Sequence, residues 1–138
     1  MQVHQVMTPE VTWAGPDTGL QEIACKMRDE DFGAMPVAEQ DRLVGMVTDR
    51  DIVVRCVAAG MDVRSATARQ VMSPQVLYCF DDESVESALQ NMGANQVRRL
   101  PVVNRDKRLV GVVSLGDLSR SSERPTAAAL KEISARPK

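Results

Sequence analysis

Apolar residues recur along this chain with two periods, and the pattern predicts one order of elements that occurs twice. Helical spacing, with apolar residues three and four positions apart, marks two amphipathic stripes. The stripes consist of Leu20, Ile23, Ala24 and Met27, and of Val85, Ala88, Leu89 and Met92. Runs typical of strands precede and follow each stripe, at 11–13, 34–37 and 43–47, and again at 75–79, 100–103 and 109–113. A second helix closes each copy, so the predicted order is strand, helix, strand, strand, helix.

Turn and capping residues give the expected ends of these helices. Thr18-x-x-Gln21 has the spacing of a capping box at the start of the first helix, and Gly33 stands where its C-terminal cap is expected. The second helix is expected from Asp49 to about Ala59, with Gly60 closing it, and its counterpart starts near Gly116. Thr67-x-x-Gln70 predicts one more helical turn before the second copy.

The two copies also share residues at fixed offsets. A shift of 65 residues places Val6 on Val71, and a shift of 66 places Gly45 on Gly111. Half-domains of about 60 residues are marginal alone, so two matching apolar faces are expected to pack about a pseudo-two-fold axis. The sequence therefore predicts an α/β fold of the α+β type, with a first repeat at 1–62, a linker at 63–70, a second repeat at 71–120 and a polar tail at 121–138. A last helix in this tail would begin at Pro125.

Composition narrows the chemistry available to the chain. Its 138 residues are 43% hydrophobic and 26% charged with a net charge of −2, which argues against disorder and against a general DNA binder. A single histidine, His4, disfavours metal sites and triad catalysis, and 3% aromatic residues disfavour binding of single-stranded nucleic acid.

No apolar run approaches the roughly 18 residues of a membrane helix, and the N-terminus lacks a signal-peptide pattern. Three widely spaced cysteines are typical of reduced thiols in a cytoplasmic protein. We expect neither an enzyme nor a membrane or metal protein.

Three motifs in each copy resemble one known family. They are the Val-Met-[Thr/Ser]-Pro start, the Met35-Pro36-Val37 and Leu100-Pro101-Val102 strands, and the Leu-Val-Gly-x-Val-[Thr/Ser]-x-x-Asp endings. Over about residues 3–120 they resemble tandem cystathionine-β-synthase (CBS) domains. The resemblance implies a Bateman module that binds adenosine-containing ligands in clefts between its repeats and dimerises into a four-repeat disk. It implies an adenine nucleotide (AMP, ADP or ATP, with NAD or S-adenosylmethionine as alternatives), no required cofactor, and regulation of a partner protein that the sequence does not name.

The resemblance assigns the ends of the repeats to the ribose of the ligand. Asp51 and Asp117 would accept hydrogen bonds from the ribose diol, and the hydroxyls of Thr48 and Ser114 would bind ribose or phosphate. The same spacing is also a plain capping pattern at a helix start, which needs no ligand.

Arginines near these positions are the candidates for phosphate binding. In the family the phosphate-binding base comes from the repeat opposite the ribose-binding aspartate, so the resemblance pairs Asp51 with Arg98 and Arg99, the better site for a charged nucleotide. It pairs Asp117 with Arg50. The guanidinium group suits phosphate because it offers a planar fork of donors. Solvated surface arginines are the alternative.

Apolar residues at the predicted strands are candidates for an adenine pocket. By resemblance they are Val11, Thr12, Met35, Pro36, Val76, Leu77, Leu100 and Pro101. Plain core packing is the alternative for each of them. The sequence thus predicts a non-enzymatic nucleotide sensor, with a ligand-free assembly module as the rival hypothesis.

Overall fold

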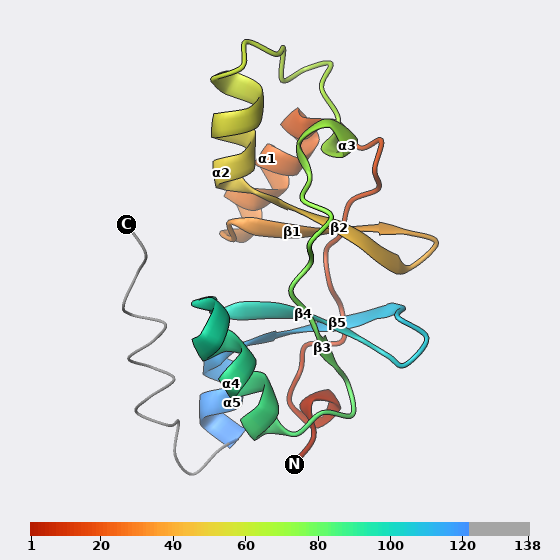
Figure 1. Cartoon of the computed structure of the whole chain (residues 1–138), viewed down its shortest axis with the longest axis vertical. Coiled ribbons are helices and arrows are strands. Elements are labelled where there is room, and N and C mark those ends of the chain that lie inside the picture. The colour runs from red at the N-terminus through yellow and green to blue at the C-terminus, as the bar shows by residue number, and fades with distance from the viewer. Residues whose placement is uncertain (122–138) are drawn as a thin grey trace. The chain divides into compact units, whose positions relative to one another are not determined.

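The computed structural model describes residues 1–121, which divide into two compact units (Figure 1). The first-repeat unit is Thr12–Val76, and the second-repeat unit combines Met1–Val11 with the chain from Leu77 onward. The units therefore do not coincide with the sequence repeats, because the segment that opens the first repeat packs with the second. The helix expected from Pro125 lies outside the described residues.

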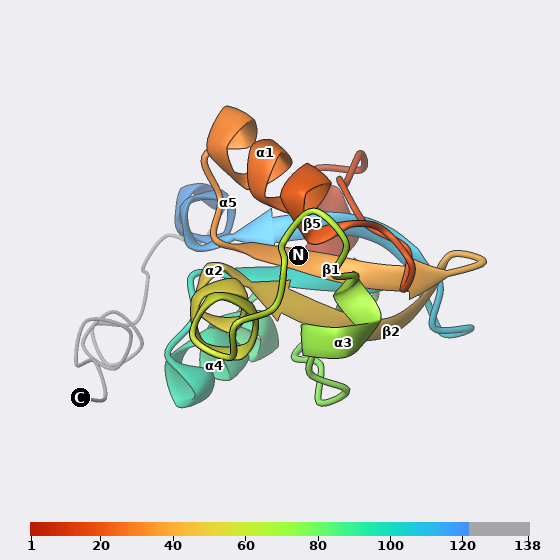
Figure 2. The ribbon, with the colours of Figure 1, turned by 90° about the horizontal axis from the view of Figure 1, so that it is seen from above.

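The first-repeat unit is a β-hairpin with its helices on one side (Figure 1), and Figure 2 shows the hairpin from the side of these helices. The antiparallel strands are β1 (Ala34–Glu39) and β2 (Arg42–Thr48), and a parallel bridge joins Ala14 to Val37. The helices are α1 (Leu20–Glu30), α2 (Asp49–Asp51), the π-helix η2 (Ile52–Val57) and α3 (Ala68–Val71). The helix predicted from Asp49 is thus confirmed as α2 and η2 in succession, and Gly60 closes it with a positive φ of 78°.

The second-repeat unit repeats this arrangement. Its sheet has the order β3-β4-β5, with β3 parallel to β4 and β4 antiparallel to β5. The strands are β3 (Cys79–Phe80), β4 (Arg99–Val103) and β5 (Leu109–Ser114). The helices are the 3-10 helix η1 (Val3–Gln5), α4 (Val85–Asn95) and α5 (Leu115–Ser121). No helix within residues 1–121 is long and apolar enough to span a membrane.

The predicted helical stripes form the two cores. Leu20 and Ile23 of α1 are fully buried in the first-repeat unit, where they belong to one cluster with Met35 and Val47. In the second-repeat unit, the stripe of α4 belongs to a cluster with Leu100 of β4. Each core also includes residues of the shorter helices, such as Val71 of α3 in the first and Leu118 of α5 in the second.

Three local predictions were wrong. Residues 11–13 form no strand, and of residues 75–79 only Cys79 enters one, since pairing begins at Ala14 and Cys79. Thr18 does not cap α1, because its hydroxyl accepts from the N–H of Gly15 and the N-cap is Gly19. The C-terminal cap of α1 is Asp31 in the left-handed conformation, two residues before Gly33.

The opening segment of each repeat docks on the β-hairpin of the other repeat's unit. Thr8 exchanges two backbone hydrogen bonds with Val112 of β5 (2.9 and 3.0 Å), and Ser73 exchanges two with Met46 of β2 (3.0 and 2.9 Å). The predicted turn at 67–70 is confirmed as α3, whose Ala68 and Val71 are fully buried in the first-repeat core. Part of the expected 63–70 linker is therefore packed core.

Candidate functional site

The candidate ribose-binding residue of the first-repeat unit lies where β2 passes into α2. Asp51 Oδ2 accepts from the backbone N–H of Thr48 at 2.9 Å, and the N–H of Asp51 donates to Thr48 Oγ1 at 3.0 Å. This reciprocal pair is the capping box that the spacing predicts. The second oxygen, Oδ1, lies 3.8 Å from Arg55 Nε, which is beyond hydrogen-bond distance. Oδ2 of Asp51 therefore forms part of the helix cap, whereas Oδ1 interacts only weakly with Arg55.

The same junction recurs between β5 and α5. Asp117 Oδ2 accepts from the N–H of Ser114 at 2.9 Å, and the N–H of Asp117 donates to Ser114 Oγ at 3.1 Å. Here Oδ1 has a strong partner, because Arg120 Nη2 donates to it at 2.7 Å. The Asp117 side chain is 17% exposed and the Arg120 side chain 75% exposed, so the pair sits at the edge of the protein surface.

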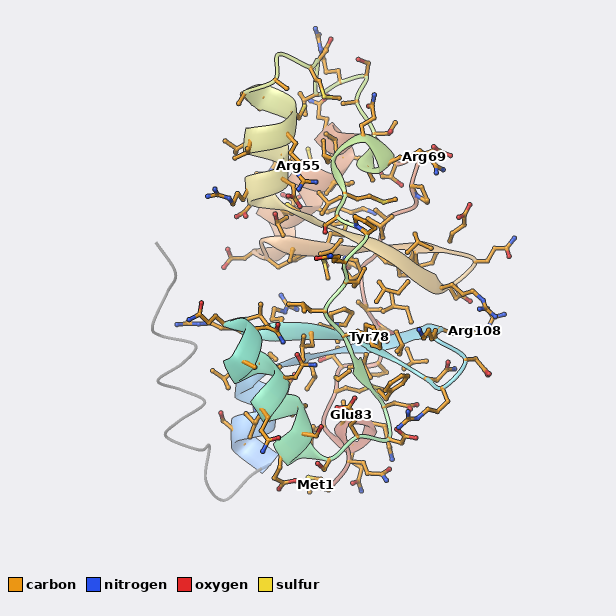
Figure 3. The ribbon with its side chains drawn as sticks, viewed as in Figure 1. Met1, Arg55, Arg69, Tyr78, Glu83 and Arg108 are labelled. Carbon is orange, nitrogen blue, oxygen red and sulfur yellow. The ribbon has the colours of Figure 1, made fainter. Side chains whose placement is uncertain are left out.

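A hollow of about 310 Å³ opens beside this second junction. We call it the Asp117 hollow; its lining residues are Met1, Gln5, Val6, Asp117 and Arg120. They supply a carboxylate, a guanidinium, an amide and two apolar side chains, all from the second-repeat unit. The N-terminal residues reach it because Thr8 is bonded to Val112, five residues before Asp117. Figure 3 labels Met1 in this unit and Arg55 in the other. The volume is at the lower end of the range for small-molecule sites, about 300–1,000 Å³.

The candidate phosphate-binding arginines are all exposed. Arg98 directly precedes β4, and its carbonyl accepts from the N–H of Leu115 at the start of α5. Arg99 pairs with Ser114 in the β4–β5 ladder. Both arginines thus belong to the same unit as Asp117, whereas Arg50 lies in α2 of the first-repeat unit. The pairing of ribose and phosphate residues from opposite repeats stays a prediction.

The candidate adenine-pocket residues fall into two groups. Met35, Pro36, Leu100 and Pro101 are buried, and Met35 and Leu100 belong to the two core clusters, as the core-packing alternative expects. Val11, Thr12, Val76 and Leu77 keep some exposure, and Thr12 donates its hydroxyl to Glu30 at 2.7 Å. Among these candidates, only the residues of the second group are partly exposed to solvent.

Four of the five residues that line the Asp117 hollow were missed from the sequence, namely Met1, Gln5, Val6 and Arg120. Arg120 follows Asp117 by three positions, so helical spacing places the two on one face and gave a usable signal. Gln5 gave none, because it joins Asp117 only through the docking of the N-terminal segment. Within residues 1–121, no three histidine, cysteine or acidic side chains cluster as metal ligands would.

Cys79 and the Asp82–Arg105 ion pair belong to the same unit but do not line the hollow. Burial raises the pKa of the Cys79 thiol to about 12, with smaller contributions from Glu83 and Asp81. Arg105 binds both carboxylate oxygens of Asp82, at 2.6 and 2.8 Å, and thereby lowers the pKa of Asp82. The Arg105 guanidinium also lies 4.0 Å from the ring centroid of Phe80. These contacts tie the β4–β5 turn to β3, and we assign them to stability.

Comparison with known proteins identifies the family and the fold of this chain. The CBS domain family matches the chain twice, over residues 3–57 and 68–124. The chain is 40% identical over 134 residues to "CBS domain-containing protein YhcV" of Bacillus subtilis (strain 168), covering 96% of this chain and 94% of that protein. The crystal structure of Hypoxic Response Protein I with two coordinated zinc ions is 38% identical, with a TM-score of 0.79 over 88% of this chain and 99% of the other.

A more distant solved structure has the same fold. The crystal structure of CBSX2 in complex with AMP is 24% identical, with a TM-score of 0.74 over 87% of this chain and 94% of its own. The predicted α+β fold with two repeats is confirmed by these comparisons. Because the family matches nearly all of both repeats, this chain belongs to the CBS domain family.

Proposed function

We propose that this chain is a regulatory module that binds an adenine nucleotide of the AMP, ADP or ATP class and signals to a partner protein by a change of conformation or assembly. NAD and S-adenosylmethionine, which also contain adenosine, are the alternative ligands. The observation that carries the proposal is the Asp117 hollow, where a carboxylate held by the backbone borders a cavity of about 310 Å³ together with a guanidinium and an amide.

The chemistry of the hollow suits a ribonucleotide. A carboxylate accepts hydrogen bonds from both hydroxyls of a ribose diol, and Asp117 is oriented for this by its bond from Ser114. Asp51 is oriented in the same way by Thr48, so each repeat has an equivalent acceptor. The AMP in the solved CBSX2 structure supports this ligand class. We extend the proposal to clefts between the repeats, with Arg98, Arg99 and Arg50 as phosphate ligands.

Isothermal titration calorimetry with AMP, ADP, ATP, NAD and S-adenosylmethionine tests the proposal. Replacing Asp117 by asparagine should weaken binding about tenfold or more, because a charge-assisted acceptor is lost while the size of the side chain is kept. The matched control is Asp106→Asn, which removes the same charge from the exposed β4–β5 turn of the same unit. If no nucleotide binds at millimolar concentration, the proposal fails.

A second function, self-association without a ligand, is favoured by one apolar surface. Val53, Val54 and Val57 on η2 are 58%, 48% and 61% exposed. At the offset of 66 residues, the second repeat has the polar residues Ser119 and Arg120 in place of Val53 and Val54. The valine surface is therefore a feature of the first repeat. We propose that it meets its own copy in a homodimer, since an isologous contact buries the same patch on both chains.

Analytical ultracentrifugation tests the homodimer. Val57→Asp should shift the protein towards monomer, because a charge placed in an apolar interface must be desolvated. Ala59→Asp adds the same charge at a nearby exposed position and serves as the control. If the wild-type protein is monomeric even at 100 times the concentration used in binding assays, the homodimer proposal is wrong.

A further inference from the structure

Met7 and Met72 hold equivalent places in the two repeats, and the thioether of each rests on a glycine of a β-hairpin. A Cβ added to Gly111 of β5 would lie 2.7 Å from Met7 Sδ and 3.3 Å from its Cγ. A Cβ added to Gly45 of β2 would lie 2.8 Å from Met72 Sδ and 3.2 Å from its Cγ. Each thioether therefore fills the space that a side chain at the glycine would occupy.

The residue after each methionine docks its segment on the same hairpin. The Thr8 carbonyl oxygen accepts from the N–H of Val112 at 3.0 Å, and the Ser73 carbonyl oxygen accepts from the N–H of Met46 at 3.0 Å. These two carbonyl oxygens lie 2.7 and 3.1 Å from the Cβ positions of the two glycines, so each borders the space that the thioether fills. The docked segments are also the anchors of the two chain connections between the units, which run through residues 11–12 and 76–77.

Both methionines are accessible to a small oxidant. Met7 and Met72 are half-buried and pack at the margins of the second-repeat and first-repeat cores, whereas Met35 and Met92 are fully buried. Hydrogen peroxide oxidises a thioether when a sulfur lone pair attacks one peroxide oxygen. An S–O bond forms, the O–O bond breaks, and water leaves with the two electrons that sulfur has lost.

A sulfoxide does not suit the space between segment and hairpin. It converts an apolar, adaptable side chain into a polar one whose oxygen is a strong hydrogen-bond acceptor. That oxygen would meet the carbonyl oxygen of Thr8 or Ser73, which is also an acceptor, and would compete with it for the N–H of Val112 or Met46. Oxidation therefore acts against the bonds that dock the segment.

We propose that Met7 and Met72 are paired methionine oxidation sites, at which hydroperoxides detach the opening segment of each repeat from its hairpin. The inference is independent of the proposed nucleotide function and gives the chain a second chemical input. The detachment is reversible, because methionine sulfoxide reductases restore the thioether and the backbone stays intact.

The test is hydrogen–deuterium exchange of the full chain, without nucleotide, before and after treatment with hydrogen peroxide. Peptide mass spectrometry identifies the methionines that have gained an oxygen atom. We expect Met7 and Met72 to be oxidised at lower peroxide concentration than the buried Met35 and Met92. Exchange at the amides that donate to Thr8 and Ser73 should then rise about tenfold or more, and a methionine sulfoxide reductase should reverse the rise.

The double variant Met7→Leu/Met72→Leu keeps apolar side chains of similar size that peroxide does not oxidise. It should retain the protection of the Val112 and Met46 amides in the presence of peroxide. The matched control is Met61→Leu, which removes another half-buried methionine outside the two docked segments and should respond as wild type does.

Three results would overturn the inference. The first is that Met7 and Met72 stay unmodified at a peroxide concentration that fully oxidises Met1, whose side chain is 65% exposed. The second is that both are oxidised while the protection of the Val112 and Met46 amides is unchanged. The third is that the double leucine variant loses this protection as the wild type does, since other side chains would then be responsible.

Discussion

Replacing Gly111 by alanine should strongly destabilise the second-repeat unit. Gly111 lies in β5, where the N-terminal segment crosses the strand. A Cβ built at this position would lie 2.7 Å from Met7 Sδ and 2.7 Å from the carbonyl oxygen of Thr8. Met7 can move its flexible end, but the Thr8 carbonyl belongs to backbone that is bonded twice to Val112.

The expected magnitude follows from these contacts. Inserting a methyl group into a closely packed site costs about 1–3 kcal/mol. If Thr8 moves away, its two backbone bonds to Val112 weaken, and each contributes about 0.5–1.5 kcal/mol. We therefore expect a loss of about 2–4 kcal/mol, a large part of the roughly 5–15 kcal/mol of a typical domain. Gly45→Ala should cost less, about 1–2 kcal/mol, because the nearest backbone atom, Ser73 O, is 3.1 Å from the built Cβ.

Urea unfolding followed by circular dichroism measures the loss, and amide hydrogen exchange at Val112 locates it. The control is Gly15→Ala, where the added Cβ meets nothing closer than Thr18 Oγ1 at 3.6 Å. That substitution should be neutral or slightly stabilising, since alanine restricts the unfolded chain. The reasoning is refuted if Gly111→Ala lies within about 0.5 kcal/mol of Gly15→Ala, or if protection of the Val112 amide is unchanged.

Three further predictions concern single side chains. Because Arg105 lowers the pKa of Asp82, the stabilisation from this pair is present above the ordinary value of 3.8 and is lost as the pH falls through the lowered one. Carboxyl ¹³C NMR should show Asp82 titrating nearer 3.8 in Arg105→Gln, and an unchanged midpoint would contradict the assignment. The Cys79 thiol, with a pKa of about 12, should resist iodoacetamide at pH 8 until the protein unfolds, and rapid native labelling of Cys79 would contradict its burial. Thr48→Ala should cost about 1 kcal/mol in thermal unfolding by removing the cap on Asp51, while a stability equal to wild type would mean that the cap contributes nothing.

Helices, strands and turns could be predicted where neighbouring residues in the sequence determine them. The stripes on α1 and α4, the hairpin strands and the turn at α3 depend on residues a few positions apart, so their patterns were sufficient. The cap of α1 was not predictable, because Thr18 had two possible backbone partners and the turn at Gly15 took its hydroxyl.

The candidate site was predictable only in part. Asp51 and Asp117 followed from the motif, and the reciprocal bonds with Thr48 and Ser114 have the predicted geometry. The motif could not tell that Arg120 engages Asp117 closely while Arg55 stays 3.8 Å from Asp51. That difference depends on how each arginine side chain folds over its own helix turn.

The sequence by itself determined that this protein is one fold written twice, since periodicity and repeated motifs are properties of the chain order. The tertiary structure alone decided which half receives each opening segment: residues 1–11 join the second-repeat unit, and Ser73 docks on β2 of the first. The physical reason is that two nearly identical hairpins offer the same backbone bonds to either segment. Long-range packing settles the choice, and it is this choice that brings Gln5 and Met1 to the hollow beside Asp117.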